Sequence, residues 1–134
     1  MPTNTARALE VSNPVERMAV RARVVQSEMM VAALSCGLRS QYNAVVAEFE
    51  AELVSHGQVL RSMFTRTYGA GGQIALDRFV TKLANDASMR SNLARRAYCA
   101  TAKRSFADLL SRRVRLVDSG VRVLQEAASG PTAR

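Results

Sequence analysis

The sequence predicts an all-α protein, a single-domain bundle of four to five helices. Along most of the chain, apolar residues recur at alternating steps of three and four, which places them on one face of a helix. Hydrophobic residues make up 48% of the 134 residues, whereas aromatic residues make up only 5% and Trp is absent. The core must therefore consist mainly of Leu, Val, Ala and Met, and three of these favour helices. A chain of this length fits one domain.

Polar segments at both ends set the limits of this domain. Residues 1–12 are polar and aperiodic, which predicts a flexible N-terminal arm. The helical bundle domain is predicted over residues 13–128. The sequence SGPTAR at residues 129–134 predicts a disordered tail, because it offers no apolar residue large enough to bury.

The first helix is predicted to begin at Asn13 and Pro14. Asparagine accepts hydrogen bonds from the free amides at a helix start, and proline fits the first helical position. Gly37 is predicted to end the helix, because glycine readily adopts the left-handed conformation of a C-terminal cap. The apolar stripe consists of Met18, Ala22, Val25, Met29, Ala32 and Cys36.

A second helix is predicted from Ser40 to the glycine-rich turn at residues 69–72. Because glycine weakens a helix interior, we expect Gly57 to bend this helix or to divide it in two. The apolar stripe consists of Tyr42, Val46, Phe49, Leu53, His56, Leu60 and Met63.

Two further helical regions fill the second half of the chain. One begins near Gln73, and its apolar pattern loosens over residues 85–91, where we expect a break and a new cap. The last region carries an apolar stripe from Leu93 to Leu124. It forms either one long helix or two helices joined near Ser111.

Cys36 and Cys99 are the only cysteines of the chain. One ends the first helix and the other lies on the apolar stripe of the last helical region. A disulfide between them would tie these helices together and stabilise the fold by about 4 kcal/mol in the chain-entropy model. Alternatively, both are buried free thiols that act as small hydrophobic residues, as is common in cytosolic proteins. The residues alone leave both alternatives open.

His56 is the only histidine, and it lies on an apolar helical stripe. It is a weak candidate for a metal or haem ligand, with Met29, Met30 or Met63 as thioether partners. The chain has no second histidine and no haem-attachment or zinc-binding motif. A histidine at the edge of the core, bonded to a backbone carbonyl, is the simpler interpretation.

The sequence contains no catalytic motif. The carboxylates of Glu48, Glu50 and Glu52 are two residues apart, so a helix would point them in different directions. No nucleophile elbow, P-loop or dinucleotide-binding motif occurs. The glycines of residues 69–72 fit a turn between helices better than an anion site. We therefore expect a protein that is not an enzyme and has no cofactor.

The net charge of +8 is concentrated near the C-terminus. Residues 1–89 carry nine basic and eight acidic side chains, whereas residues 90–134 carry ten basic and three acidic ones. Almost all of the basic residues are arginines, which bind carboxylates and phosphates through paired hydrogen bonds. This pattern predicts an anionic partner, although a solvated face or pairing with the Glu48–Glu52 segment would also explain part of it. The residues predicted to bind a partner are Arg104, Arg112, Arg113, Arg115 and Arg122.

Two segments resemble a group of small secreted helical proteins of alphaproteobacteria. The segments are VAALSCGLRSQYNAVVAEFEAEL and GGQIALDRFVTKLANDASMRS, the latter followed by YCATA, and the resemblance covers residues 29–110. It implies a periplasmic or secreted location and a Cys36–Cys99 disulfide, and it implies no activity. This chain differs by its basic extension beyond residue 111 and by an N-terminus without the apolar segment of a signal peptide. Taken alone, that N-terminus favours the cytoplasm.

Together, these observations predict a non-catalytic binding or structural protein of the bacterial cell envelope. The region after Ser111, apolar on one side and rich in arginine on the other, is expected to contact an acidic protein, a second copy of the chain or an anionic surface. One alternative is a cytoplasmic nucleic-acid-binding protein that uses the same arginines. A second alternative is a haem or metal carrier that uses His56. No transmembrane segment is expected.

Overall fold

The computed structural model describes residues 8–119, and within this range the chain is helical without a strand. The elements are α1 (Pro14–Cys36), α2 (Arg39–Glu48), α3 (Glu50–Tyr68), a 3-10 turn η1 (Gly69–Gly71), α4 (Gly72–Leu93) and α5 (Arg95–Leu110). Residues 116–119 are helical again. The predicted all-α bundle is therefore confirmed.

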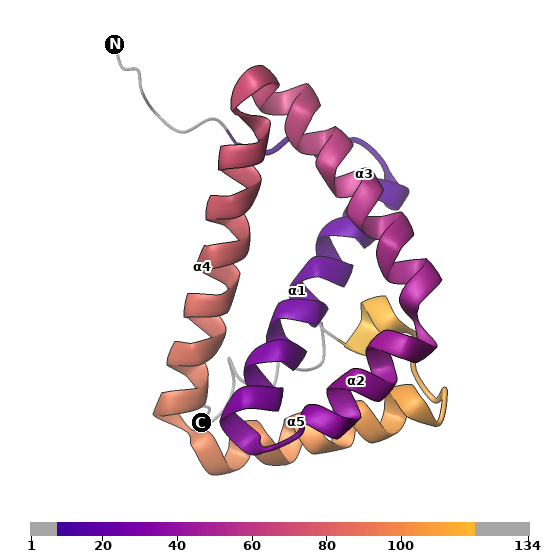
Figure 1. Cartoon of the computed structure of the whole chain (residues 1–134), viewed down its shortest axis with the longest axis vertical. Coiled ribbons are helices and arrows are strands. Elements are labelled where there is room, and N and C mark those ends of the chain that lie inside the picture. Colours follow the sequence, from indigo (N-terminus) through magenta and orange to yellow (C-terminus); the bar gives the residue numbers. More distant parts are fainter. Residues whose placement is uncertain (1–7, 120–134) are drawn as a thin grey trace.

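Helix α1 is the central element, because it packs against α2, α3, α4 and α5 (Figure 1). The side chain of Asn13 caps its start by accepting a hydrogen bond from the Glu16 amide at 2.9 Å. Gly37 caps its end with a φ of 69°, in the left-handed region. Both ends of the predicted first helix are confirmed, since each cap residue supplies the geometry that a helix end requires.

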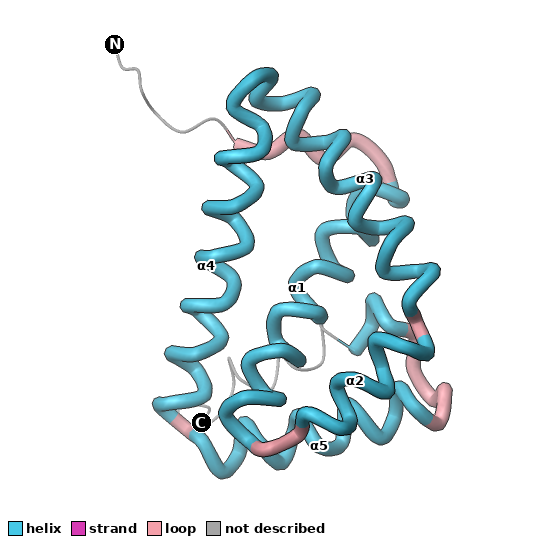
Figure 2. The backbone as a smooth tube through the Cα atoms, in the orientation of Figure 1, coloured by secondary structure: helices cyan, strands magenta, loops and turns pink. Residues whose placement is uncertain are grey.

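The other helices surround α1 as an open triangle (Figure 2). Helix α3 rises along one side, the turn η1 reverses the chain, and α4 descends along the other side. Helices α2 and α5 lie across the base. At the base, the C-terminal end of α1 therefore meets α5, although the two helices are far apart in the sequence.

Within residues 8–119, the buried side chains form two core clusters. The larger one joins the C-terminal part of α1 to α2 and α5, and also includes Leu116 and Val117 beyond α5. The smaller one joins the start of α1 to α3 and α4 through Leu60, Met63 and Phe64. Phe106 and Leu109 fill the base, each at most 1% exposed. The predicted aliphatic core thus includes a few aromatic anchors.

The predicted division of the second helix at Gly57 is wrong. Helix α3 runs through Gly57, and the break falls at Phe49, with φ −109° and ψ 21°. An internal glycine costs a helix only about 1 kcal/mol relative to alanine, and burial of Leu60 and Met63 in the next turns offsets this cost. The break at Phe49 allows its ring to enter the core, where it is 7% exposed.

The predicted break over residues 85–91 is also wrong, because α4 continues to Leu93. Ala87 and Ser91 are both fully buried, so tertiary packing holds the helix through this polar stretch. The chain turns instead at Ala94, with φ −148° and ψ 59°. Leu93, expected on an apolar stripe, is 79% exposed.

The joint expected near Ser111 is present. Helix α5 ends at Leu110, and Ser111 is its C-terminal cap. Arg112 then adopts a φ of 63°, which is uncommon for a residue with a side chain and turns the chain sharply. Of the two alternatives for the last region, two separate helical segments are therefore observed.

The described end of the predicted arm, residues 8–12, lies against α3. The Glu10 amide donates to the Thr67 hydroxyl at 3.1 Å, and the Glu10 carbonyl accepts from Arg66 Nη2 at 2.7 Å. Arg66 also pairs with Glu16 at 2.6 Å. These bonds hold the entry to α1 in a defined position. The predicted tail at 129–134 lies outside the described residues.

Candidate functional site

A disulfide joins Cys36, the last residue of α1, to Cys99 on the second turn of α5. The sulfur atoms are 2.03 Å apart and the Cα atoms 5.5 Å apart. Of the two alternatives left open by the residues, the structure shows the disulfide, which the resemblance also implied. The disulfide therefore fixes the position of α5 relative to the C-terminal end of α1.

Helix α5 has two different faces. Its inner face packs Tyr98, Ala102, Phe106 and Leu109 into the core. Its outer face carries small and basic residues, which are Arg96, Ala100, Lys103, Arg104 and Ala107, all exposed. Apart from the adjacent Lys103 and Arg104, each of these positions is three or four residues from the next, so they form one continuous stripe. The stripe combines positive charge with short side chains that leave the backbone accessible.

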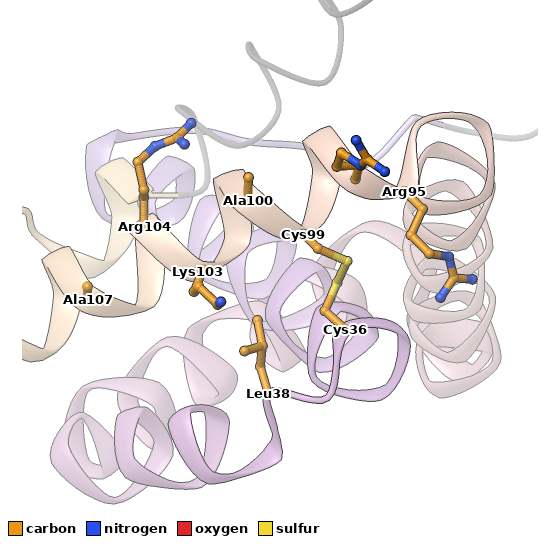
Figure 3. Close-up of a pocket in the computed structure, with 9 residues that line it drawn as sticks. Cys36, Leu38, Arg95, Cys99, Ala100, Lys103, Arg104 and Ala107 are labelled. Atoms are coloured by element: carbon orange, nitrogen blue, oxygen red, sulfur yellow. A yellow bond between two sulfur atoms is a disulfide. The ribbon is translucent and has the colours of Figure 1, made fainter.

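An open groove of about 660 Å³ lies beside this stripe (Figure 3). We call it the disulfide groove. The disulfide and the Leu38 side chain form one wall, and α5 forms the other. Its lining residues are Cys36, Leu38, Arg95, Arg96, Cys99, Ala100, Lys103, Arg104 and Ala107. Four of these are cations and none is acidic.

The cations of the groove differ in how firmly they are held. Arg95 Nη1 donates to the Ser35 carbonyl at 2.8 Å and thereby caps the end of α1. Arg104 Nη2 donates to the Thr101 hydroxyl at 3.4 Å. Arg96 and Lys103 have no acceptor among residues 8–119. Within this range, the positive charges of these two side chains are therefore not compensated.

The predicted partner-binding arginines do not form one cluster. Arg104 lines the groove, whereas Arg112 pairs with Glu48 and lies 5.0 Å above the Phe49 ring. Arg115 pairs with Asp118 at 3.1 Å. The expected pairing of some arginines with the Glu48–Glu52 segment is thus observed at Arg112.

Two further arginines complete the predicted set. Arg113 is exposed in the turn after α5. Arg122 lies outside the described residues. Arg90, which belongs to the same basic segment of the sequence, is instead turned inward and pairs with the buried Glu28.

His56 lies at the edge of the core with a side chain that is 16% exposed. Its Nε2 lies 3.2 Å from a carboxylate oxygen of Glu52, one turn earlier in α3. The expected position is correct, but the partner is a carboxylate and not a backbone carbonyl. Among residues 8–119, no three His, Cys, Asp or Glu side chains are grouped as metal ligands.

Sequence reasoning missed the groove as a site, although it identified the basic region. Leu38 and Ala100 carry no functional signal in the sequence, and tertiary packing of α5 together with the disulfide brings them to one groove. The i, i+4, i+7 spacing of Arg96, Ala100 and Lys103 was a usable signal, because it places charge and short side chains on one face.

Comparisons with protein-family models, with curated proteins and with solved structures find no match to this chain. None of the helices described is both long and apolar enough to cross a lipid bilayer.

Proposed function

We propose that the protein is a non-catalytic binding component of the bacterial cell envelope. In this proposal, the disulfide groove binds an acidic segment of a partner protein. The observation that carries the proposal is the lining of the groove, where four cations surround short aliphatic side chains without an acidic residue.

The spacing of the cations suits a peptide partner. Arg96 and Lys103 are seven residues apart on α5, which corresponds to about 10 Å at 1.5 Å per residue. Glutamates two turns apart on a partner helix are separated by a similar distance. Paired hydrogen bonds from arginine to a carboxylate would fix the orientation of that helix.

The apolar part of the groove favours a protein over a nucleic acid. The exposed Ala100 and Ala107 offer a shallow aliphatic surface that a small apolar side chain can cover. Among the described residues, no aromatic side chain lines the groove on which a base could stack. Phosphate contacts alone remain the basis of the nucleic-acid alternative.

The disulfide supports the envelope location. Disulfides persist in the periplasm and outside the cell, whereas cytosolic thiols are kept reduced. Cys36 and Cys99 are both only partly buried, so the reductants of the cytosol could reach the disulfide.

Site-specific photocrosslinking in the host organism tests the proposed function. A photoreactive residue at Ala100 is expected to form an adduct with an acidic protein segment. Ser88, exposed on α4, is the matched control position and is expected to form no such adduct. Charge reversal by Arg96→Glu and Lys103→Glu should remove the Ala100 adduct. Identical adducts from both positions, or adducts with nucleic acid or lipid, would contradict the proposal.

A further inference from the structure

A second cavity, of about 440 Å³, lies between α1, α3 and α4, away from the disulfide groove. We call it the Gly57 cavity. It is bordered by two arginines, Arg23 of α1 and Arg61 of α3, and by Asp77 of α4. Leu60, Leu76 and Val80 supply apolar walls. We propose that this cavity binds a small organic monocarboxylate with an apolar body.

Gly57 keeps one wall of the cavity open. It lies in the interior of α3, where no turn or positive φ requires a glycine. An added Cβ would be 3.9 Å from Arg61 Nη1, so the Arg61 guanidinium lies close to the space left by the missing side chain. The glycine weakens the helix by about 1 kcal/mol relative to alanine.

Neither arginine has a carboxylate partner in the described part of the chain. Arg23 is partly buried, and burial lowers its pKa because it disfavours the charged guanidinium. Its Nη1 donates to Gln26 at 3.2 Å, while its Nε is buried without an acceptor in the described part of the chain. Arg61 is exposed and forms no ion pair within residues 8–119. A bound carboxylate would accept a hydrogen bond from the buried Arg23 Nε and pair with the Arg61 guanidinium.

Charge and shape define the ligand class. Two arginines and one aspartate give the lining a net charge of one positive unit, which matches a monoanion better than a phosphate dianion. Asp77 is partly engaged, since it accepts a hydrogen bond from Gln73 at 2.9 Å. The apolar walls favour an alkyl or aryl body, and the volume lies in the usual range for small-molecule sites.

Isothermal titration with octanoate tests this inference, with octylammonium as the probe of opposite charge and equal chain length. Octanoate is expected to bind saturably at one site, whereas octylammonium is not. Arg61→Gln should weaken octanoate binding by about tenfold, because one charge-assisted hydrogen bond is lost. Gly57→Leu should abolish binding by filling the cavity, with circular dichroism to confirm that it folds.

Two control variants separate this cavity from other basic surfaces. Arg78→Gln removes an exposed charge on α4 outside the cavity, and Arg96→Gln removes one from the disulfide groove. Both are expected to bind octanoate like the unmodified protein. Failure of octanoate to saturate, equal binding of octylammonium, or loss through Arg96→Gln but not Arg61→Gln would overturn the inference. The first two outcomes concern the Gly57 cavity alone, whereas loss through Arg96→Gln would place the carboxylate in the disulfide groove.

Discussion

The Tyr98 hydroxyl of α5 donates a hydrogen bond to Glu28 Oε1 of α1 at 3.1 Å. Glu28 is 3% exposed, and its other carboxylate oxygen pairs with Arg90 of α4. Three helices therefore meet at one buried carboxylate. A buried charge is tolerated only when it is paired and hydrogen-bonded, so this contact fixes how α1, α4 and α5 align.

Removing the Tyr98 hydroxyl should weaken this junction moderately. Tyr98→Phe keeps the ring in the core but leaves the carboxylate short of one donor. We expect a loss of about 1–2 kcal/mol in the free energy of unfolding, measured by urea denaturation at pH 7.

Removing the cation should cost more. Arg90→Met leaves Glu28 buried and unpaired, with an expected loss of about 3–5 kcal/mol. The double variant Glu28→Met and Arg90→Met should be more stable than Arg90→Met alone, because no isolated charge remains. A double variant that is less stable than Arg90→Met would contradict the explanation that an unpaired charge on Glu28 causes the loss.

The contact between Glu16 and Arg66 predicts acid sensitivity. Hydrogen bonds from Arg66 and from the Ser12 amide lower the pKa of Glu16 from 4.5 to about 2. Because the unfolded chain takes up this proton at higher pH, the stabilisation is complete above about pH 4.5 and is lost as the pH falls toward 2. Urea denaturation across this range should show a smaller pH dependence for Glu16→Gln. Glu50→Gln, an exposed control, should keep the original dependence.

The disulfide should contribute substantially to stability. Cys36 and Cys99 are 63 residues apart, so replacing both by alanine releases a long loop in the unfolded state. The chain-entropy model gives a loss of about 4 kcal/mol. Reducing the unmodified protein should lower its stability by a similar amount, and reductant should not affect the double variant. Equal stability of the double variant and the unmodified protein would contradict this account.

Two glycines should respond to alanine in opposite directions. Gly57→Ala should raise the free energy of unfolding by about 0.5–1 kcal/mol, because the helix continues through this position and a methyl group fits there. At Gly72, an added Cβ would be 3.0 Å from the Phe64 carbonyl oxygen, so Gly72→Ala should lower the melting temperature. If both variants shift the melting temperature in the same direction, the packing between α3 and α4 differs from that described.

Local sequence signals were sufficient for the fold class and for several helix ends. The cap at Asn13 and the left-handed Gly37 depend on neighbouring residues only, so they could be predicted. The joint near Ser111 was one of two alternatives that the sequence left open. The break at Phe49 could not, because it results from burial of the ring against distant helices. The low helix propensity of Gly57 was outweighed by the tertiary contacts of the following turn.

The candidate site was predictable only in part. Composition identified the basic C-terminal region, and the two cysteines limited their possible pairing to one disulfide. Whether an arginine faces solvent depends on three-dimensional neighbours, as Arg90 and Arg96 show. Arg90 pairs inside the bundle with Glu28, which is 62 positions earlier in the sequence, whereas Arg96 lines the groove.

The state of Cys36 and Cys99 in the host cell tests the central claim most directly. Protein isolated after rapid acid quenching would be denatured and alkylated, without and with prior reduction, and its intact mass measured. The account predicts no alkylation before reduction and alkylation of both cysteines after it. Alkylation of both cysteines without reduction would show that the native protein carries free thiols, and would contradict both the disulfide and the envelope location.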